Sequence, residues 1–190
     1  MRPSRSPFPA ILVLFWALGL QGAWAGPNGI DTRVQIVGEE IRTEVSFFVR
    51  VPQQQVWDVI TDYDRATEIF RDLQSSKVVS RSGDTLRVLQ KDQVRVGPFT
   101  FPVESLKQVR LTEPVKAESH LISGSLRKYD STTELIPERD GTRLVYRSLS
   151  IPPAYALAMI GESSLKRETE ERFKQVRAAI LRKQQVAATQ

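Results

Sequence analysis

The sequence predicts an α+β protein in which a strongly curved, seven-stranded antiparallel sheet is covered by one long C-terminal helix. Over residues 77–150, apolar residues alternate with a period of two, and turn signals such as Gly97-Pro98 separate the runs. Residues 52–73 have a period near four, which predicts two short helices after the first strand. Residues 151–187 carry small or apolar residues at spacings of four and three: Leu157, Gly161, Leu165, Thr169, Phe173, Val176 and Ile180. Because so curved a sheet cannot fill its own concave face, we expect the long helix to lie across it.

The first 25 residues have the features of a secretory signal peptide. Arg2 and Arg5 give a positive start, residues 8–20 are almost wholly apolar, and Ala23-Trp24-Ala25 is a small-x-small cleavage pattern. The apolar run of about 13 residues is short for a membrane span, which needs about 20. We therefore expect cleavage after Ala25 and export, to a bacterial periplasm, with an uncleaved anchor as the alternative.

The predicted organisation after the leader is a lead-in over residues 26–32, one domain over residues 33–187 and a tail over residues 188–190. The chain has 27 basic and 22 acidic residues. No dense basic block with interleaved aromatics occurs, so nucleic acid is not an expected partner. The absence of cysteine excludes disulfides, thiol nucleophiles and cysteine-based metal sites. The domain must be stabilised by its core, which its length permits, and a monomer is expected.

The first part of the domain is expected to be extended and then helical. Residues 33–51 fit either one long bent strand or a short hairpin, because the alternation breaks near Gly38. Pro52 suits the first turn of the first short helix, since the N–H that proline lacks is not needed there. Asp64 is expected to cap the second short helix.

The remaining strands are placed by alternation and turn signals. Pro102 predicts an edge position or a bulge, and Gly141 predicts a positive φ at the end of a hairpin loop. Glu104 has the opposite parity to Phe101 and Val103 and is expected to face water. The expected strands cover residues 77–81, 85–96, 99–111, 115–122, 126–136 and 144–150.

Three stretches carry a resemblance to a known superfamily. They are Val51-Pro52 leading into the Val-Trp of residues 56–63, the Gly141-Thr142 hairpin, and the Pro152-Pro153 entry to the terminal helix. In this order and spacing, residues 33–183 resemble the START-like (SRPBCC) helix-grip superfamily, within its polyketide cyclase/dehydrase and coenzyme Q-binding group.

The resemblance implies a deep apolar cavity between sheet and helix that binds a lipid, sterol, quinone or polyketide-like molecule. A minority of members are cyclases, and the superfamily has no shared catalytic signature, so no catalytic residue is assigned. Quinone-binding relatives tend to have an aromatic in the penultimate strand, where this chain has Ser131-Thr132-Thr133 with Tyr129 nearby. This departure argues against coenzyme Q as the ligand.

The candidate cavity lining consists of aromatic residues, the single histidine and the small or apolar residues of the first half of the terminal helix. A buried tyrosine hydroxyl needs a partner, which in a binding protein can be the polar end of a ligand. The alternative for each aromatic residue is packing in the core. The alternative for the histidine is a surface or hydrogen-bonded position. The alternative for the small residues is that they allow the helix to approach the sheet closely. The predicted lining residues are Trp57, Tyr63, Phe70, Phe99, Phe101, His120, Tyr129, Tyr146, Tyr155, Leu157, Ala158, Gly161 and Leu165.

The charged residues are expected to be structural. The second half of the terminal helix has a solvated face with i,i+4 pairs, Glu168 with Arg172 and Glu170 with Lys174. Three aspartates near the helix break at residues 58–64 lack the spacing of a calcium loop and fit helix-end solvation. We therefore expect neither a metal nor a cofactor.

Three functions remain open at this point. The first is an exported, non-enzymatic binding or carrier protein for a hydrophobic or amphipathic small molecule, for which transient membrane contact is compatible. The second is a cyclase- or dehydratase-type enzyme that uses a tyrosine, His120 or a carboxylate in the same cavity. The third is a protein-interaction module with a filled core, which predicts no pocket beneath residues 154–165.

Overall fold

The structure, a computed structural model, describes residues 29–187, and the predicted leader and tail lie outside the described residues. The helices are α1 (Gln53–Ile60), the 3-10 helix η1 (Tyr63–Glu68), α2 (Ala154–Leu157) and α3 (Glu162–Ala187). The strands are β1 (Ile30–Val37), β2 (Glu40–Val49), β3 (Leu73–Ser82), β4 (Thr85–Val96), β5 (Phe99–Thr112), β6 (Lys116–Gly124), β7 (Lys128–Glu138) and β8 (Gly141–Ile151).

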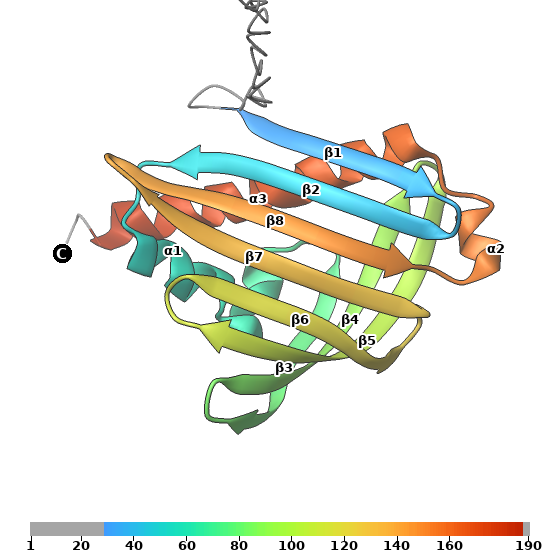
Figure 1. The fold of residues 1–190 in the computed structure, drawn as a ribbon, viewed down its shortest axis with the longest axis horizontal. Helices are drawn as coiled ribbons and strands as arrows, with labels where there is room; N and C mark the ends of the chain where they lie inside the picture. Colours follow the sequence, from blue (N-terminus) through green and yellow to red (C-terminus); the bar gives the residue numbers. More distant parts are fainter. Residues whose placement is uncertain (1–28, 188–190) are drawn as a thin grey trace, which may run out of the picture.

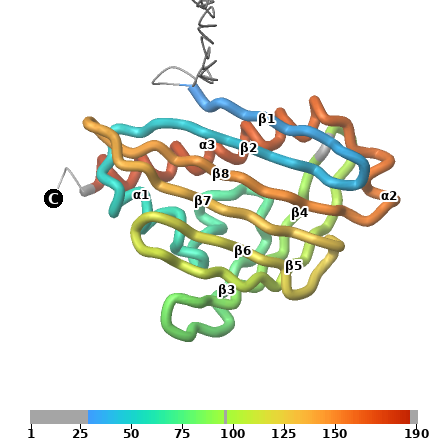
Figure 2. The backbone as a smooth tube through the Cα atoms, in the orientation of Figure 1, coloured from blue at the N-terminus to red at the C-terminus, as the bar shows by residue number. Residues whose placement is uncertain are grey.

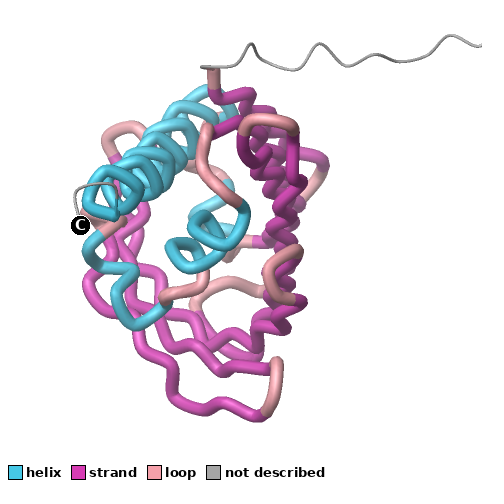
Figure 3. The backbone as a smooth tube through the Cα atoms, turned by 90° about the vertical axis from the view of Figure 1, so that its left-hand side faces the viewer, coloured by secondary structure: helices cyan, strands magenta, loops and turns pink. Residues whose placement is uncertain are grey.

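All eight strands form one antiparallel sheet in the order β1-β2-β8-β7-β6-β5-β4-β3. The sheet bends strongly, so that β3, β4 and β5 curve away from the plane of β1, β2 and β8 (Figures 1 and 2). The helices lie on the concave side, with α3 along it and α1 and η1 at one end (Figure 3). This is the predicted helix-grip arrangement of a curved sheet around a long C-terminal helix.

The sheet has eight strands rather than the predicted seven, because the first extended segment is a hairpin. β1 and β2 pair from Ile30 opposite Phe47 to Val37 opposite Glu40. Gly38 has φ of +61° in the turn, a conformation that glycine adopts without strain. The sheet also begins within the predicted lead-in of residues 26–32. Ile30, Asp31 and Thr32 already pair with β2, and Thr32 is buried.

The C-terminal helix is interrupted, which corrects the expectation of one continuous helix. The Gly161 carbonyl accepts hydrogen bonds from the N–H groups of Ser164 and Leu165, so α3 begins after Gly161. Glycine is a weak helix former, and α2 is only the four residues Ala154–Leu157. The apolar stripe holds from Leu165 onward, with Phe173, Val176 and Ile180 packed on the sheet.

The core fills the end of the concave face nearest α1. Phe47, Leu135, Leu144 and Ile180 are each about 1% exposed, and Trp57 is 3% exposed. The Phe47 and Phe173 rings meet edge-on with centroids 6.3 Å apart. Within residues 29–187, no helix combines the length and apolar character that crossing a membrane requires.

Two local predictions fail for identifiable reasons. Gly141 does not have a positive φ; a Cβ there would collide with the Val49 carbonyl, so a close backbone approach requires glycine. Asp64 does not cap η1, whose N-cap is Asp62, and its Oδ1 instead accepts a hydrogen bond from the Val78 N–H at 2.8 Å.

Two other local predictions are confirmed. Pro102 pairs with β4 in a part of β5 that precedes the first β6 pair, so this stretch of β5 has one neighbour. Glu104 is exposed, and its Oε2 lies 3.2 Å from the Lys91 Nζ.

Both predicted ion pairs on the terminal helix are replaced by others. Arg172 pairs with Asp92 of β4 at 2.8 Å, and Lys174 pairs with Glu171 at 2.6 Å. The first replacement links α3 to the sheet, whereas the second lies within the helix.

Candidate functional site

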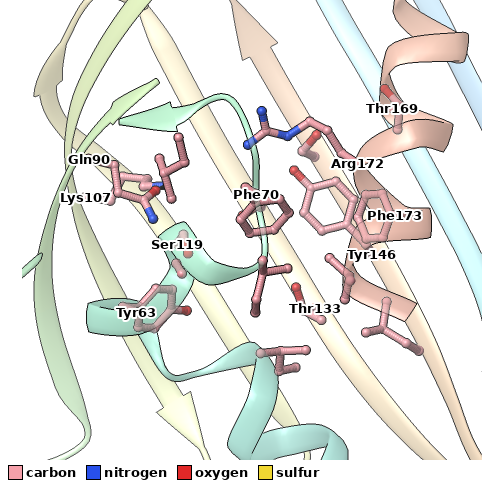
Figure 4. Close-up of a pocket in the computed structure, with 18 of the residues that line it drawn as sticks. Tyr63, Phe70, Gln90, Lys107, Ser119, Thr133, Tyr146, Thr169, Arg172 and Phe173 are labelled. Carbon is pink, nitrogen blue, oxygen red and sulfur yellow. Dashed lines mark hydrogen bonds between the residues drawn. The ribbon is translucent and has the colours of Figure 1, made fainter. Parts of the chain in front are cut away.

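A cavity of about 290 Å³ lies between the concave face of the sheet and the helices α1, η1 and α3 (Figure 4). Its side chains come from the sheet on one side and from the helices on the other. The lining residues are Thr43, Val59, Ile60, Asp62, Tyr63, Ala66, Ile69, Phe70, Leu73, Gln90, Lys107, Ser119, Tyr129, Ser131, Thr133, Leu144, Tyr146, Ser148, Thr169, Arg172, Phe173 and Val176.

The sheet side of the cavity is rich in hydroxyl groups. Thr43 of β2 lies opposite Ser148 of β8, Ser148 opposite Ser131 of β7, and Ser131 opposite Ser119 of β6. Antiparallel partners place their side chains on the same face, so these four residues form one row across four strands, here named the hydroxyl row. Their side chains are short, and a row of short side chains under a helix leaves volume unfilled.

The helix side of the cavity is mainly apolar. α1 and η1 contribute Val59, Ile60 and Ala66, and the segment after η1 contributes Ile69 and Phe70. From α3, Thr169, Arg172 and Phe173 point toward the cavity (Figure 4), and Val176 also lines it. The cavity therefore has a hydroxyl-rich floor and a mainly apolar roof, an arrangement that suits a ligand with one polar and one apolar side.

Three tyrosines line the cavity. The Tyr129 and Tyr146 hydroxyls are 2.9 Å apart and share a hydrogen bond, and the Tyr146 ring packs on Phe173 with centroids 5.0 Å apart. Burial raises the pKa of Tyr63, and burial also raises the pKa of Tyr146, with nearby Tyr129 adding to both shifts. Tyr63 and Tyr146 therefore stay protonated near neutral pH and act as hydrogen-bonding groups, not as phenolate bases.

Two cations and one carboxylate also line the cavity. The Lys107 Nζ donates to Gln90 Oε1 at 2.5 Å and lies 5.4 Å from the centroid of the Tyr129 ring. Arg172 donates to Asp92 at 2.8 Å, and its guanidinium lies 4.9 Å from the Phe70 ring centroid. The carboxylate is that of Asp62, which lies 3.8 Å from Arg65.

A second, smaller pocket of about 180 Å³ lies beneath residues 152–165. Its lining is apolar except for four hydroxyl-bearing side chains, those of Ser125, Tyr129, Ser150 and exposed Tyr155, and it is here named the apolar pocket. Tyr129 lines both spaces, so its side chain forms a wall that they share.

The predicted lining residues divide into three groups. Tyr63, Phe70, Tyr129 and Tyr146 line the main cavity, and Phe101, Tyr129, Tyr155 and Leu165 line the apolar pocket. Trp57 is in the core, whereas Phe99, Ala158 and Gly161 are exposed and Leu157 lines neither space. The larger cavity lies under Thr169 to Val176 of α3, and only the smaller pocket lies under residues 154–165, where the cavity mouth was expected.

His120 lies on the convex face of the sheet, outside both spaces. Its neighbour Ser119 points into the cavity, so alternation turns the imidazole outward. The side chain is 63% exposed, and its Nδ1 lies 2.7 Å from the Asp130 Oδ1. The expectation that His120 faces the cavity is therefore corrected. His120 is instead a surface residue with a hydrogen-bond partner, which was the alternative interpretation.

The sequence interpretation missed Lys107, Gln90, Arg172 and the hydroxyl row. The alternation along β5 could have placed Lys107 at the cavity. Lys107 and buried Val109 are two residues apart, so their side chains lie on the same, concave face of the sheet. Among residues 29–187, no group of three or more histidine, cysteine or carboxylate residues could hold a metal ion. Asp58, 3.8 Å from Lys183, and Asp64, bonded to β3, belong to different contacts.

Comparison with solved structures identifies the fold. The STAR-related lipid transfer protein from Xanthomonas axonopodis (fragment 25-204) matches with a TM-score of 0.63 and 12% identity over 80% of this chain and 94% of its own. A START superfamily protein from Mycobacterium smegmatis matches with a TM-score of 0.57 and 12% identity over 76% of this chain and 98% of its own. The Zhui aromatase/cyclase from Streptomyces sp. R1128 matches with a TM-score of 0.55 and 12% identity over 76% of this chain and 90% of its own.

No curated protein sequence matches the chain significantly. The sequence profile of one family does match, over residues 49–174, which is more than half of the chain. This range runs from the end of β2 through most of the cavity-lining part of α3. The chain therefore belongs to the family described as polyketide cyclase / dehydrase and lipid transport.

Proposed function

We propose that this protein is an exported carrier that binds a hydrophobic or amphipathic small molecule between its sheet and α3. The observation that carries the proposal is the cavity with a hydroxyl-rich floor and an apolar roof. Its volume of about 290 Å³ is near the lower end of the usual range for ligand pockets, about 300 to 1,000 Å³. One water occupies only about 30 Å³ in the liquid, so the space can take a ligand.

The comparisons support this proposal at the level of ligand class. The family description includes lipid transport, and one structural neighbour is a lipid transfer protein. A filled-core interaction module is disfavoured by the two spaces beneath the terminal helices.

A cyclase- or dehydratase-type enzyme is the second candidate. One structural neighbour is an aromatase/cyclase, and the raised pKa values of Tyr63 and Tyr146 would keep both hydroxyls protonated as donors to a substrate carbonyl. This candidate predicts turnover of a poly-β-ketone probe that falls at least ten-fold in Tyr63→Phe or Tyr146→Phe. A carrier predicts binding of the same probe without conversion.

The carrier function is tested by extracting purified protein with organic solvent and identifying the extract by mass spectrometry. We expect an apolar or amphipathic compound in near-stoichiometric amount from the wild type. Ser131→Leu places a larger side chain in the hydroxyl row and should strongly reduce the amount. Thr132→Leu is the matched control, because its side chain has the opposite parity to Ser131 and lies on the convex face beside Arg147. Equal yields from both variants, or no compound from the wild type, would contradict the proposal.

Export is tested separately by expressing the full chain and sequencing the N-terminus of the product in the periplasmic fraction. The small-x-small pattern before Gly26 predicts a mature chain that begins at Gly26. Full-length protein retained in the membrane fraction would favour the uncleaved anchor.

A further inference from the structure

Lys107 differs from the other cation of the cavity in its partners. Arg172 is paired with Asp92 at 2.8 Å. Lys107 has the neutral Gln90 oxygen and the Tyr129 ring, and no carboxylate of residues 29–187 lies within ion-pair distance of its ammonium. A partly buried positive charge without a carboxylate partner is stabilised when an anion comes within reach.

The surroundings of Lys107 fix its orientation. The Gln90 amide nitrogen donates to the Ser76 hydroxyl at 2.9 Å, so the Gln90 oxygen is turned toward Lys107. The lysine ammonium has three donors, and Gln90 accepts one of them. The remaining donors are available to a ligand, because Lys107 lines the cavity with its nitrogen turned inward (Figure 4).

The position of Lys107 connects the two spaces. β6 lies between β5 and β7, but its pairing with β7 ends at His120 and Asp130. Beyond that point the Lys107 side chain extends over the Tyr129 ring, which is the wall shared by the main cavity and the apolar pocket. The ammonium therefore lies near their common boundary.

The apolar pocket offers no partner for a charge. No residue of its lining is an aspartate, glutamate, lysine or arginine. Its large apolar side chains include Ile41, Val94, Phe101, Val103, Ile160 and Leu165. Such a pocket suits a hydrocarbon chain.

We infer that the ligand is a single-chain amphiphile with a carboxylate head, which binds Lys107 while its hydrocarbon chain enters the apolar pocket past Tyr129. This inference rests on the proposed carrier function and specifies its ligand class. One ammonium balances one negative charge, so a monoanionic carboxylate matches the site better than a doubly charged phosphate.

Binding of decanoate, decanol and decyltrimethylammonium, measured by isothermal titration calorimetry, tests the head group. We expect decanoate to bind most tightly and Lys107→Gln to weaken it about ten- to hundred-fold, the usual effect of a charged hydrogen bond. Decanol binding should be unchanged in that variant, and Lys107→Arg should retain most of the decanoate affinity. Lys91→Gln is the matched control, since Lys91 is an exposed lysine paired with Glu104 on the neighbouring strand.

Equal affinities for decanoate and decanol, with no effect of Lys107→Gln, would overturn the carboxylate inference and leave the carrier proposal standing. Failure of all three probes to bind the wild type would contradict both the carboxylate inference and the carrier proposal. The path of the chain is tested with Val94→Phe, which narrows the apolar pocket. This variant should weaken hexadecanoate at least ten-fold more than octanoate, and an equal effect on both would place the chain elsewhere. Thermal unfolding of every variant separates lost binding from lost folding.

Discussion

The two ends of the concave face are built from the same strands but differ in what they enclose. Near α1, Phe47, Leu144 and Leu135 form one row across β2, β8 and β7, and each is about 1% exposed. Four residues back along β7, Ser131 belongs to the hydroxyl row, which borders a cavity of about 290 Å³. α3 covers both ends, and the side chains that the sheet presents to it are larger at the packed end than along the hydroxyl row.

α3 reflects the same division. Over the packed end it presents Ala179 and Ile180, which are both buried. Over the cavity it presents Thr169 and Arg172 beside Phe173, and Arg172 also reaches Asp92. The comparison therefore indicates that the packed end supplies stability and that the hydroxyl-lined end leaves the space in which we propose that a ligand binds.

The largest expected effect is on stability at the packed end. Leu135→Ala removes most of a side chain that is 1% exposed and should lower the free energy of unfolding by about 2 to 5 kcal/mol. Ser131→Ala, on the same strand and face, should change it by less than about 1 kcal/mol. Urea unfolding monitored by circular dichroism measures both variants. Similar losses in the two would show that the ends are equally packed.

The next effect concerns the link between α3 and β4 beside the cavity. The Arg172 and Asp92 side chains are 25% and 15% exposed, and Asp92 Oδ1 is buried without a hydrogen-bond partner among the described residues. Arg172→Ala leaves that carboxylate unpaired and should cost about 1 to 3 kcal/mol of unfolding free energy.

Lys174→Ala on the same helix is the control, because its pair with Glu171 is exposed to solvent and should contribute little to stability. Urea unfolding of both variants and of Asp92→Asn provides the measurement. A loss in Arg172→Ala no greater than that in Lys174→Ala would mean that the link to β4 adds nothing to stability.

The architecture could be predicted from sequence because it depends on periodicity. Alternation placed β4 at residues 85–96, which are its observed bounds, and the spacing from Leu165 to Ile180 gave the buried face of α3. The break at Gly161 was missed because its spacing still fits a helical stripe, although glycine at that point lets α3 start anew.

The cavity was predicted only in part from large aromatic side chains, of which Tyr63, Phe70, Tyr129 and Tyr146 line it. Aromatic side chains fill space, and Trp57 accordingly lies in the core. The hollow instead follows from short hydroxyl side chains at matching positions of four strands, which no single strand reveals. The register that aligns Thr43, Ser148 and Ser131 depends on long-range pairing of the chain. That any of the predicted lining residues binds a ligand stays a prediction.

The smallest effect concerns the tyrosines at the cavity and appears only at high pH. The pKa of Tyr63 is raised by burial above the ordinary value near 10, so the folded state holds this proton more tightly than the unfolded state. Its contribution to stability is complete below pH 10 and is lost as the pH rises from there toward the folded pKa. Tyr63→Phe should change the free energy of unfolding by less than about 1 kcal/mol at pH 7.

Urea unfolding of wild type and Tyr63→Phe at a series of pH values from neutrality past pH 10 measures this dependence. Lysines and other tyrosines also titrate in this range, so the difference between the two proteins is the informative quantity. We expect the two stabilities to run parallel below pH 10 and the wild type to lose more above it. Parallel curves throughout would mean that the Tyr63 hydroxyl is hydrated, and the cavity beside η1 would then be more open to solvent than its apolar roof implies.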